Sequence, residues 1–242
     1  MNSPKSSSIM KIGSVSFLRI PVRTRIITPE DRMSDIVREF ALPYLKPGDI
    51  LTISESPLAI TQGRAVYVTD LKISLLARVL WKFVSKSPYG VGLRCVNSMQ
   101  CAIDECGSWR IFVAACAGAF GKLLGKKGWF YIVAGRQAAL IDADSTSPIP
   151  PYHLTVIKGP LNPEKEAQEL FEKFGCPVAI MDINDIGGSW MIGASDGLSS
   201  QFMEKVMHDN PQGNEDELTP LCIVRRLYEK DLPPTDPNPV SE

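Results

Sequence analysis

The chain has 242 residues, of which 44% are apolar and 22% are charged, and its formal net charge is −1. This composition is typical of a globular protein with a substantial core, and the balanced charge gives no overall reason to expect a nucleic acid or a membrane as partner. The longest apolar run, residues 111–120, is too short to cross a bilayer. The first residues are polar and lack the apolar core of a secretory signal, so we expect a soluble, cytoplasmic protein.

The chain contains six cysteines and two histidines. No two cysteines form a CxxC pair, and the chain has few histidines, so the usual ligands of a zinc site are scarce. Cysteines in this pattern are typical of reduced thiols in a cytosol rather than of a disulfide framework.

The first part of the chain alternates predicted strands and helices. We expect strands at residues 14–21, 50–54 and 65–69, where apolar residues are bounded by proline or glycine. Thr28, Pro29 and the acids after them have the form of a helix start, and the apolar spacing that follows predicts an amphipathic helix ending near Pro43. A second helix is predicted at residues 74–83.

The second part is less regular. Residues 109–119 fit either a helix or a buried strand. Glycines flank the aromatic run 128–134 and the short run 138–141, and both are read as strands. We also expect strands at 154–157, 177–181 and 221–225, a helix at 163–174 that ends at Gly175, and a helix at 195–207.

These elements do not follow a regular βαβ order, and neither a Rossmann glycine motif nor a P-loop occurs. The sequence therefore predicts an α+β fold with mixed sheets and helices. Residues 1–10 and 231–242 are rich in serine or proline and are expected to be disordered tails. Residues 11–230 would form the functional region, which could comprise two subdomains.

The stretch IMDINDIGGSW, residues 180–190, suggests a site. Asp182, Asn184 and Asp185 follow an apolar strand, and Gly187 and Gly188 come next. Carboxylate and amide oxygens are the ligands that magnesium, manganese and calcium prefer, and glycine lets the backbone approach a phosphate. An Asx turn closed by glycine would explain the same residues without a metal. The residues alone leave both readings open.

A second acidic pair, Asp104 and Glu105, follows another short apolar run. Two such clusters could converge on a metal pair that clamps nucleotide phosphates, or could be unrelated surface turns. Arg23, Arg25 and Arg64 lie in connecting segments, where they could bind phosphate or carboxylate or remain solvated. Neither histidine belongs to a nucleophile motif, so catalysis by a Ser/His or Cys/His pair has no support in the sequence, and the catalytic residues are unknown at this point.

Four segments in order resemble the coenzyme F420-0:L-glutamate γ-glutamyl ligase family. They are SESPLAITQGRAVYV at residues 54–68, AID at 102–104, INDIGGSWMIG at 183–193, and NPQG followed by TPLCIVRR at 210–226. The likeness extends over most of the chain. Each motif is short, and their common order carries the resemblance.

The resemblance implies a γ-glutamyl ligase-like α+β fold, often a homodimer, that uses GTP (or ATP) with Mg²⁺ or Mn²⁺. In that family an acceptor carboxylate becomes an acyl phosphate, and the amine of L-glutamate then displaces phosphate to form an amide. Such chemistry needs neutralised phosphate charge and exact positioning rather than covalent work by side chains.

By position in these motifs, the resemblance implies that Asp104, Asp185 and Gln212 are metal ligands. We also predict nucleotide or substrate binding by the following residues: Arg23, Arg25, Ser54, Arg64, Gly187 and Gly188. The chain also departs from the family pattern. Ile60 stands near the family's nucleotide-contacting lysine, Gly107 replaces an asparagine, Ile186 replaces a threonine ligand, and Met191 replaces an arginine.

Two other functions follow from these departures. The acceptor could be a folate, which also carries a γ-glutamyl tail, in place of the deazaflavin F420-0. Alternatively, the chain could be a non-catalytic relative that binds a small molecule and has lost the nucleotide chemistry.

Overall fold

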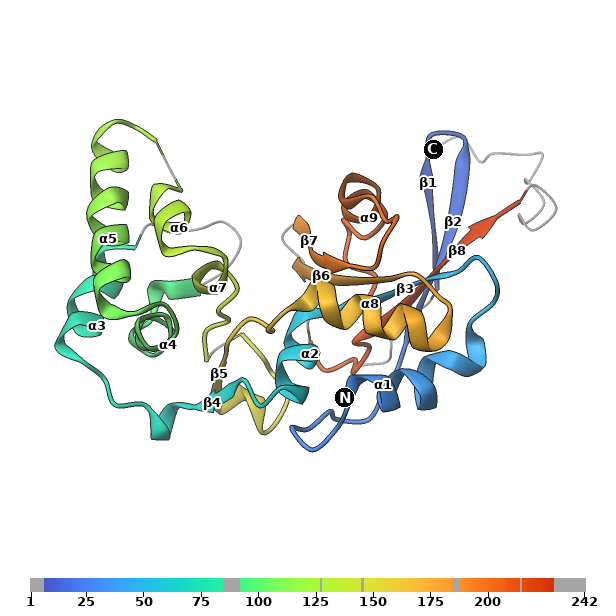
Figure 1. Cartoon of the computed structure of the whole chain (residues 1–242), viewed down its shortest axis with the longest axis horizontal. Coiled ribbons are helices and arrows are strands. Elements are labelled where there is room, and N and C mark those ends of the chain that lie inside the picture. Colours follow the sequence, from blue (N-terminus) through green and yellow to red (C-terminus); the bar gives the residue numbers. More distant parts are fainter. Residues whose placement is uncertain are drawn as a thin grey trace, which may run out of the picture.

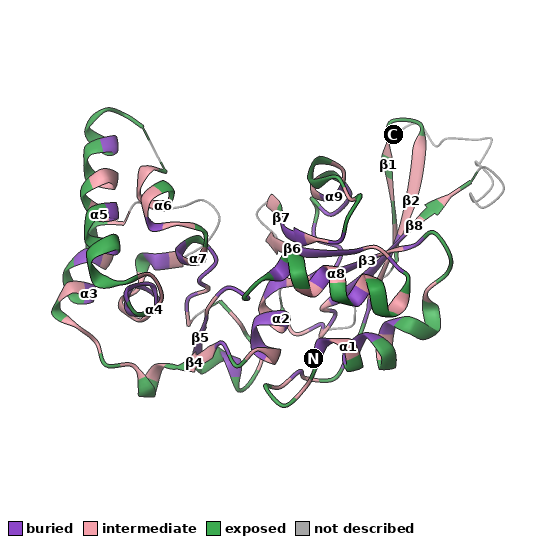
Figure 2. Cartoon of the chain, viewed as in Figure 1, coloured by how far each residue is buried: buried purple, intermediate pink, exposed green. Residues whose placement is uncertain are grey.

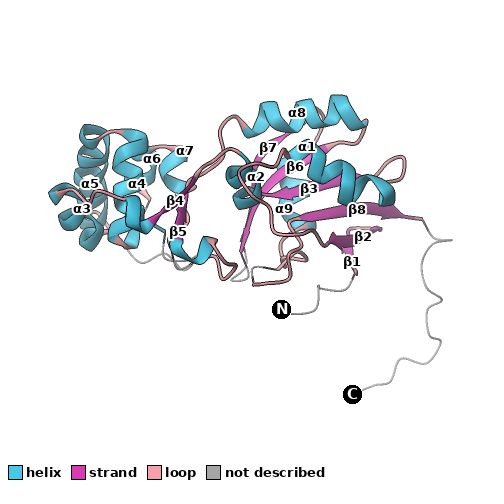
Figure 3. Ribbon diagram, turned by 90° about the horizontal axis from the view of Figure 1, so that it is seen from below, coloured by secondary structure: helices cyan, strands magenta, loops and turns pink. Residues whose placement is uncertain are grey.

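A computed structural model describes residues 7–84, 92–126, 128–144, 146–184, 188–213 and 215–228. Helices and strands are mixed along the chain, which confirms the predicted α+β class. The molecule is elongated: a mixed sheet with its helices occupies one end and a group of helices the other (Figures 1 and 3). We call these the sheet region and the helical region. The short strands β4 (Ala65–Tyr67) and β5 (Thr155–Ile157) pair between them.

Six strands form the main sheet in the order β1-β2-β8-β3-β6-β7. The strands are β1 (Ser8–Ile12), β2 (Val15–Val22), β3 (Ile50–Ser54), β6 (Val178–Asn184), β7 (Gly188–Ala194) and β8 (Leu221–Leu227). Only β3 and β6 pair in parallel among the described strands, and Ser54 lies opposite Met181 at the end of that pair. The carboxyl ends of β3 and β6 therefore reach the same edge of the sheet.

Side-chain alternation lets β6 bury residues on both faces of the sheet. Val178 and Ile180 pack with α1 (Met33–Ile36) and α8 (Pro163–Phe174) in one apolar cluster. Ala179 and Met181 pack with α9 (Ser200–Val206) in another. Helix α2 (Glu55–Thr61) starts directly after β3 and belongs to the first cluster. Both faces of the sheet are thus covered, so its carboxyl edge is where polar side chains can gather.

The helical region has its own apolar cluster. It is built from α3 (Leu75–Leu80), α4 (Val96–Cys106), α5 (Ser108–Leu123), α6 (Trp129–Ala134) and α7 (Arg136–Ala139). Helices α5 and α6 pack closely because Gly121 has no side chain. A Cβ atom there would lie 2.9 Å from Cγ of Trp129 and 3.1 Å from the carbonyl oxygen of Lys126.

Most predicted elements of the sheet region are confirmed. The strands at 50–54 and 221–225 and the helix at 163–174 appear as β3, β8 and α8, and Gly175 ends α8 in the left-handed conformation. The ambiguous segment 109–119 is helical and lies within α5. The expectation of reduced thiols also agrees with the structure, in which the six cysteines are free.

Several expectations were wrong. The runs 128–134 and 138–141 are not strands; they lie mainly in helices α6 and α7, because their aromatic and aliphatic side chains pack against other helices instead of a sheet. Helix α1 starts at Met33 rather than Thr28, since the Asp31 carboxylate accepts the backbone N–H of Thr28 and closes a turn before it.

Two segments have limits that differ from the predicted ones. Residues 8–10, expected in a disordered tail, pair with β2 as part of β1. The last helix is shorter than predicted and covers Ser200–Val206. The remaining residues of the first expected tail, 1–6, lie outside the described ranges, as do residues 229–242.

Candidate functional site

A cavity of about 710 Å³ opens at the carboxyl edge of β3 and β6. Its walls come from the connection after β2, the end of β3 with the start of α2, the chain after α7, the segment 146–152, the end of β6 and the loop 210–220. Segments far apart in sequence therefore meet here. Polar groups that gather at such strand ends on a rigid sheet are a common basis for a ligand site.

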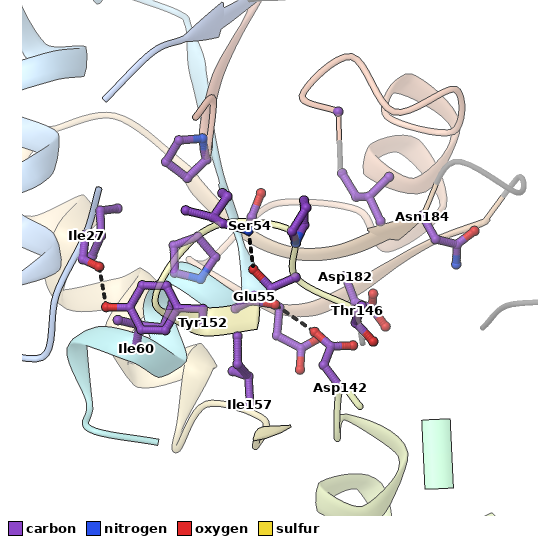
Figure 4. Close-up of a pocket in the computed structure, with 18 of the residues that line it drawn as sticks. Ile27, Ser54, Glu55, Ile60, Asp142, Thr146, Tyr152, Ile157, Asp182 and Asn184 are labelled. Atoms are coloured by element: carbon purple, nitrogen blue, oxygen red, sulfur yellow. Dashed lines mark hydrogen bonds between the residues drawn. The ribbon is translucent and has the colours of Figure 1, made fainter. Parts of the chain in front are cut away.

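Three carboxyl groups, those of Glu55, Asp142 and Asp182, lie on one side of the cavity (Figure 4). Glu55 is the first residue of α2 and follows β3, while Asp182 lies in β6, one residue beyond the last paired position of β3. Asp142 is brought to them by two backbone hydrogen bonds with Ile157, of 2.9 and 3.2 Å. Strand pairing thus holds all three carboxyl groups in place.

Burial, with neighbouring negative charge in two cases, raises the pKa of each of these carboxyl groups. Burial, and then the charge of Asp142, raise the pKa of Asp182 to about 6. Burial raises the pKa of Glu55 well above its usual range, the charges of Asp182 and Asp142 add to this, and Arg136 opposes it. Burial also raises the pKa of Asp142, against a hydrogen bond of 2.8 Å from the Ser56 hydroxyl. The group repels further negative charge and would be stabilised by a cation.

Asn184 lines the same cavity, with its side chain apart from the three carboxyl groups (Figure 4). It lies two residues beyond Asp182 on the same strand, so both side chains leave β6 on one face. The Oδ1 atom of Asn184 is buried, and no hydrogen-bond partner for it is present among the described residues. A buried acceptor without a partner costs roughly 1–3 kcal/mol, and such an atom in a cavity points to a missing donor or cation.

The opposite side of the cavity is apolar. Ile27, Ile60 and Ile157 line it, and the Tyr152 ring lies among them with its hydroxyl donating to the Ile27 carbonyl at 2.6 Å (Figure 4). Burial raises the pKa of Tyr152 to about 12, so its hydroxyl stays neutral. The cavity therefore pairs an acidic side with an apolar side.

The predicted metal ligands are distributed as follows. Asp104 lies exposed on α4, accepts a hydrogen bond of 2.7 Å from the Gln100 amide, and does not line the cavity. Gln212 is buried and does not line the cavity; its amide nitrogen donates at 3.0 Å to the hydroxyl of Ser54, which does line it. Asp185 lies outside the described residues. Within the described ranges, no three Asp, Glu, His or Cys side chains are placed to hold a metal ion as they stand.

Two of the predicted binding residues do line the cavity, namely Ser54 and Arg25. The Arg25 guanidinium is also paired with Asp31, at 2.7 and 2.5 Å. Arg64 does not line the cavity; it is buried and forms an ion pair of 2.7 Å with Glu105.

Of the remaining binding residues, Arg23 is exposed between β2 and α1 and does not line the cavity. Gly188 begins β7 opposite Asn184, and Gly187 lies outside the described residues.

Sequence reasoning missed Glu55 and Asp142. Glu55 stands in the quoted stretch SESPLAI, and a charged residue directly after the strand ILTIS was the available signal. Asp142 follows the apolar run 138–141, the same pattern that drew attention to Asp182 and Asp104.

Comparison with models of protein families gives a match for this chain. The family model F420-0:Gamma-glutamyl ligase matches residues 21–200, which is more than half of the chain and includes Glu55, Asp142 and Asp182. No curated protein matches the sequence. Among the described residues, no helix has the length and apolar character needed to span a membrane.

Proposed function

The chain belongs to the F420-0:gamma-glutamyl ligase family, and on that premise we propose that it forms an amide between L-glutamate and an acceptor carboxylate, F420-0 or a folate. The proposal includes GTP or ATP as the phosphate donor, Mg²⁺ or Mn²⁺ as the cation, and an acyl phosphate of the acceptor as the intermediate. The observation that carries it is the convergence of Glu55, Asp142 and Asp182 in the large cavity.

We place the cation on Asp142, Asp182 and the Asn184 amide oxygen, with Glu55 beside them. These oxygen ligands suit a hard divalent cation, and the unpartnered Oδ1 of Asn184 would gain a partner. Because no three acids among the described residues are placed for a metal as they stand, side-chain movements must accompany binding, above all at Asn184. Asp104 lies outside the cavity and takes no part in this arrangement.

The charge of the cavity supports a cation as well. Arg25 is the single Lys or Arg among its described lining residues, which also include Glu215 and Glu217 in addition to the three carboxyl residues. A nucleotide polyphosphate would meet strong repulsion in such a cavity unless divalent charge compensated the carboxylates. When bound, the metal would supply that charge and polarise the transferred phosphoryl group.

The protein's own residues would position the reactants. Arg25 is close enough to the cavity to meet an anionic substrate group, and Asp31 holds it in a fixed orientation. The apolar side around Ile27, Ile60 and Tyr152 suits the flat ring of a deazaflavin or a pterin. The acceptor's carboxylate would then point toward the acidic side, where phosphate transfer needs it.

Turnover with defined substrates tests the proposal. The protein would be incubated with GTP or ATP, Mn²⁺, L-glutamate and either F420-0 or a folate, and the product analysed by mass spectrometry for one added glutamyl group. We expect Asp142→Asn and Asp182→Asn to lower the rate at least about 100-fold, in line with the loss of an electrostatic catalytic group. The matched control Asp104→Asn should stay close to the wild-type rate.

Equal losses in all three variants would contradict the placement of the cation in the cavity. An unchanged rate in Asp142→Asn and Asp182→Asn would contradict it as well. Absence of any glutamyl product with both nucleotides would contradict the ligase activity itself.

A non-catalytic binding function is the second candidate, and Ile60 favours it. Ile60 is buried and lines the cavity near the position where the family pattern has a lysine that contacts the nucleotide. An isoleucine cannot neutralise phosphate. A binding protein would show a higher melting temperature with F420-0 or a folate alone, and would release no phosphate with any acceptor.

The homodimer that the resemblance implies stays a prediction, as does the cytoplasmic location. The molar mass in solution, measured by light scattering, would check the homodimer.

A further inference from the structure

Helix α5 carries an apolar stripe on its outer side. The exposed residues of this stripe follow the helical spacing i, i+3, i+4, i+7, i+11 and i+14; they are Trp109, Phe112, Val113, Cys116, Phe120 and Leu123. Two of them protrude strongly, since Trp109 is 76% and Leu123 84% exposed. Figure 2 shows α5 as a largely exposed helix at the end of the molecule.

This stripe does not belong to the core. Ile111, Ala114 and Gly121 face inward and are buried, and the helical spacing places them on the side of α5 opposite to the stripe. The helix is therefore apolar on two sides, although only one side packs against protein. An amphipathic surface helix would carry charged residues where this stripe lies.

Helix α3 extends the apolar surface. It packs beside α5 in the helical region, and Leu75 and Val79 lie exposed on it, 81% and 53% respectively. Phe83, in the turn that follows α3, is 70% exposed. We call the exposed apolar residues of α5, α3 and this turn the outer face. It lies at the end of the molecule opposite the sheet (Figures 1 and 3).

The segment of sequence that carries the outer face is rich in basic residues, although one of them, Arg136, is paired with Glu164 at 2.6 Å. Residues 71–139 contain ten lysines and arginines but two acids, Asp104 and Glu105, whereas the rest of the chain has sixteen against twenty-five. Glu105 is already paired with Arg64 and Lys158. The overall charge of −1 thus hides a net charge of +8 in the segment that carries the outer face.

Basic side chains also accompany the outer face, chiefly on α3 and in the turn after it, and we call them its basic border. Lys122 precedes Leu123 on α5, and Arg78 and Lys82 alternate with Val79 and Phe83. All three are exposed, and none has an acidic partner within ion-pair distance among the described residues. Their charge is therefore available to a partner.

We propose that the outer face docks on an anionic lipid bilayer. Apolar and aromatic side chains with lysine and arginine at their border are the pattern of helices that lie in the membrane interface, with the apolar groups inserted and the cations at the headgroups. A second copy of the chain fits less well, because two faces of the same positive charge would meet. A nucleic acid fits less well too, since its interfaces are polar rather than aliphatic.

Vesicle flotation tests this docking with the full chain. The wild type is expected to float with phosphatidylcholine vesicles that contain about one-third phosphatidylserine, and to detach as salt is raised, because the anionic headgroups attract Lys and Arg within a Debye length. Binding to pure phosphatidylcholine should be several-fold weaker. Trp109 fluorescence should shift to the blue on binding, as its ring leaves water.

Two sets of variants separate the apolar and the charged contributions. The triple change Trp109→Ser, Phe120→Ser and Leu123→Ser should lower the partition coefficient at least about tenfold, because it removes three inserted side chains. Arg78→Glu with Lys122→Glu should lower it by a similar factor, at roughly fivefold for each lost charge. The matched control is Leu42→Ser with Tyr44→Ser, which removes exposed apolar side chains from the sheet region and should leave binding unchanged.

Several results would overturn the docking proposal. One is a wild type that floats with neither kind of vesicle, and another is a triple variant that binds as well as the wild type. A dimer that light scattering detects and that the triple change abolishes, without vesicle binding by the wild type, would assign the outer face to a second copy. Equal binding to both kinds of vesicle would contradict the role of the basic border.

Discussion

The sheet region and the helical region depart from the usual arrangement of a protein in opposite ways. The sheet region buries or half-buries carboxyl groups in a cavity, where Asp182 and Glu55 have raised pKa values. The helical region instead exposes large apolar side chains along α5. Buried carboxyl groups and exposed apolar side chains both lower stability, because charged groups are better solvated in water and apolar side chains are more stable in the interior. Such costs are expected at sites of function, so the comparison separates a site for chemistry from a site for docking.

The largest expected effect is the difference in the free energy of unfolding between variants on the two sides of α5. Ile111 is fully buried, and Val113, two residues away, lies on the outer face. We expect Ile111→Ala to lower the free energy of unfolding by about 3 kcal/mol, through lost burial and the cavity left behind. Val113→Ala should change it by less than about 0.5 kcal/mol, as is usual for exposed positions. Urea unfolding followed by circular dichroism would measure both.

Similar decreases in the free energy of unfolding for Ile111→Ala and Val113→Ala would mean that the outer face is covered in solution. That result would contradict the difference between the two sides of α5.

A substitution in the carboxyl cluster is expected to change the free energy of unfolding by a smaller amount, and to raise it instead of lowering it. Because Asp182 has a pKa of about 6 when folded and a usual value near 3.8, its contribution to stability is full below about pH 4 and is lost as the pH rises to about 6. The neutral side chain in Asp182→Asn does not ionise, so the variant does not lose this stability as the pH rises. We therefore expect the variant to be more stable than the wild type by about 1–2 kcal/mol at pH 7.5 and nearly equal to it at pH 4. Thermal unfolding across this pH range would measure the difference.

An Asp182→Asn variant that is less stable than the wild type at pH 7.5 would show that the charge is well compensated in the folded protein. Asp104→Asn serves as the control for replacing an acid outside the cavity, since Asp104 is exposed on α4.

The sequence allowed good prediction of the sheet region and poor prediction of the helical region. Strands β3 and β8 and helix α8 are bounded by proline, glycine or turn residues and carry clear apolar patterns, so their limits could be read within a few residues. Residues 128–134 are mostly strand-favouring side chains after a glycine, yet they fold mainly as helix α6, because they pack against α5, which approaches closely at Gly121.

Prediction of the candidate site was partial for a similar reason. Asp182 and Ser54 could be found because they stand at the ends of recognisable strands. Asp142 could not be connected to them, since its position depends on backbone pairing with Ile157, a contact that no local pattern records. Asp104 has the same local pattern as Asp142 but points away from the cavity on an exposed face of α4. Which acid belongs to the site is decided by the fold.

Mn²⁺ binding in the absence of nucleotide tests most directly whether the cavity acids hold the cation. Free Mn²⁺ would be followed by electron paramagnetic resonance at pH 7.5 while the wild type, Asp142→Asn and Asp104→Asn are titrated in turn. We expect one site in the wild type and in Asp104→Asn, an affinity at least about tenfold lower in Asp142→Asn, and proton release on binding, because carboxyl groups with raised pKa must lose their protons to bind the metal. Full Mn²⁺ affinity in Asp142→Asn together with its loss in Asp104→Asn would contradict the account and place the cation on α4.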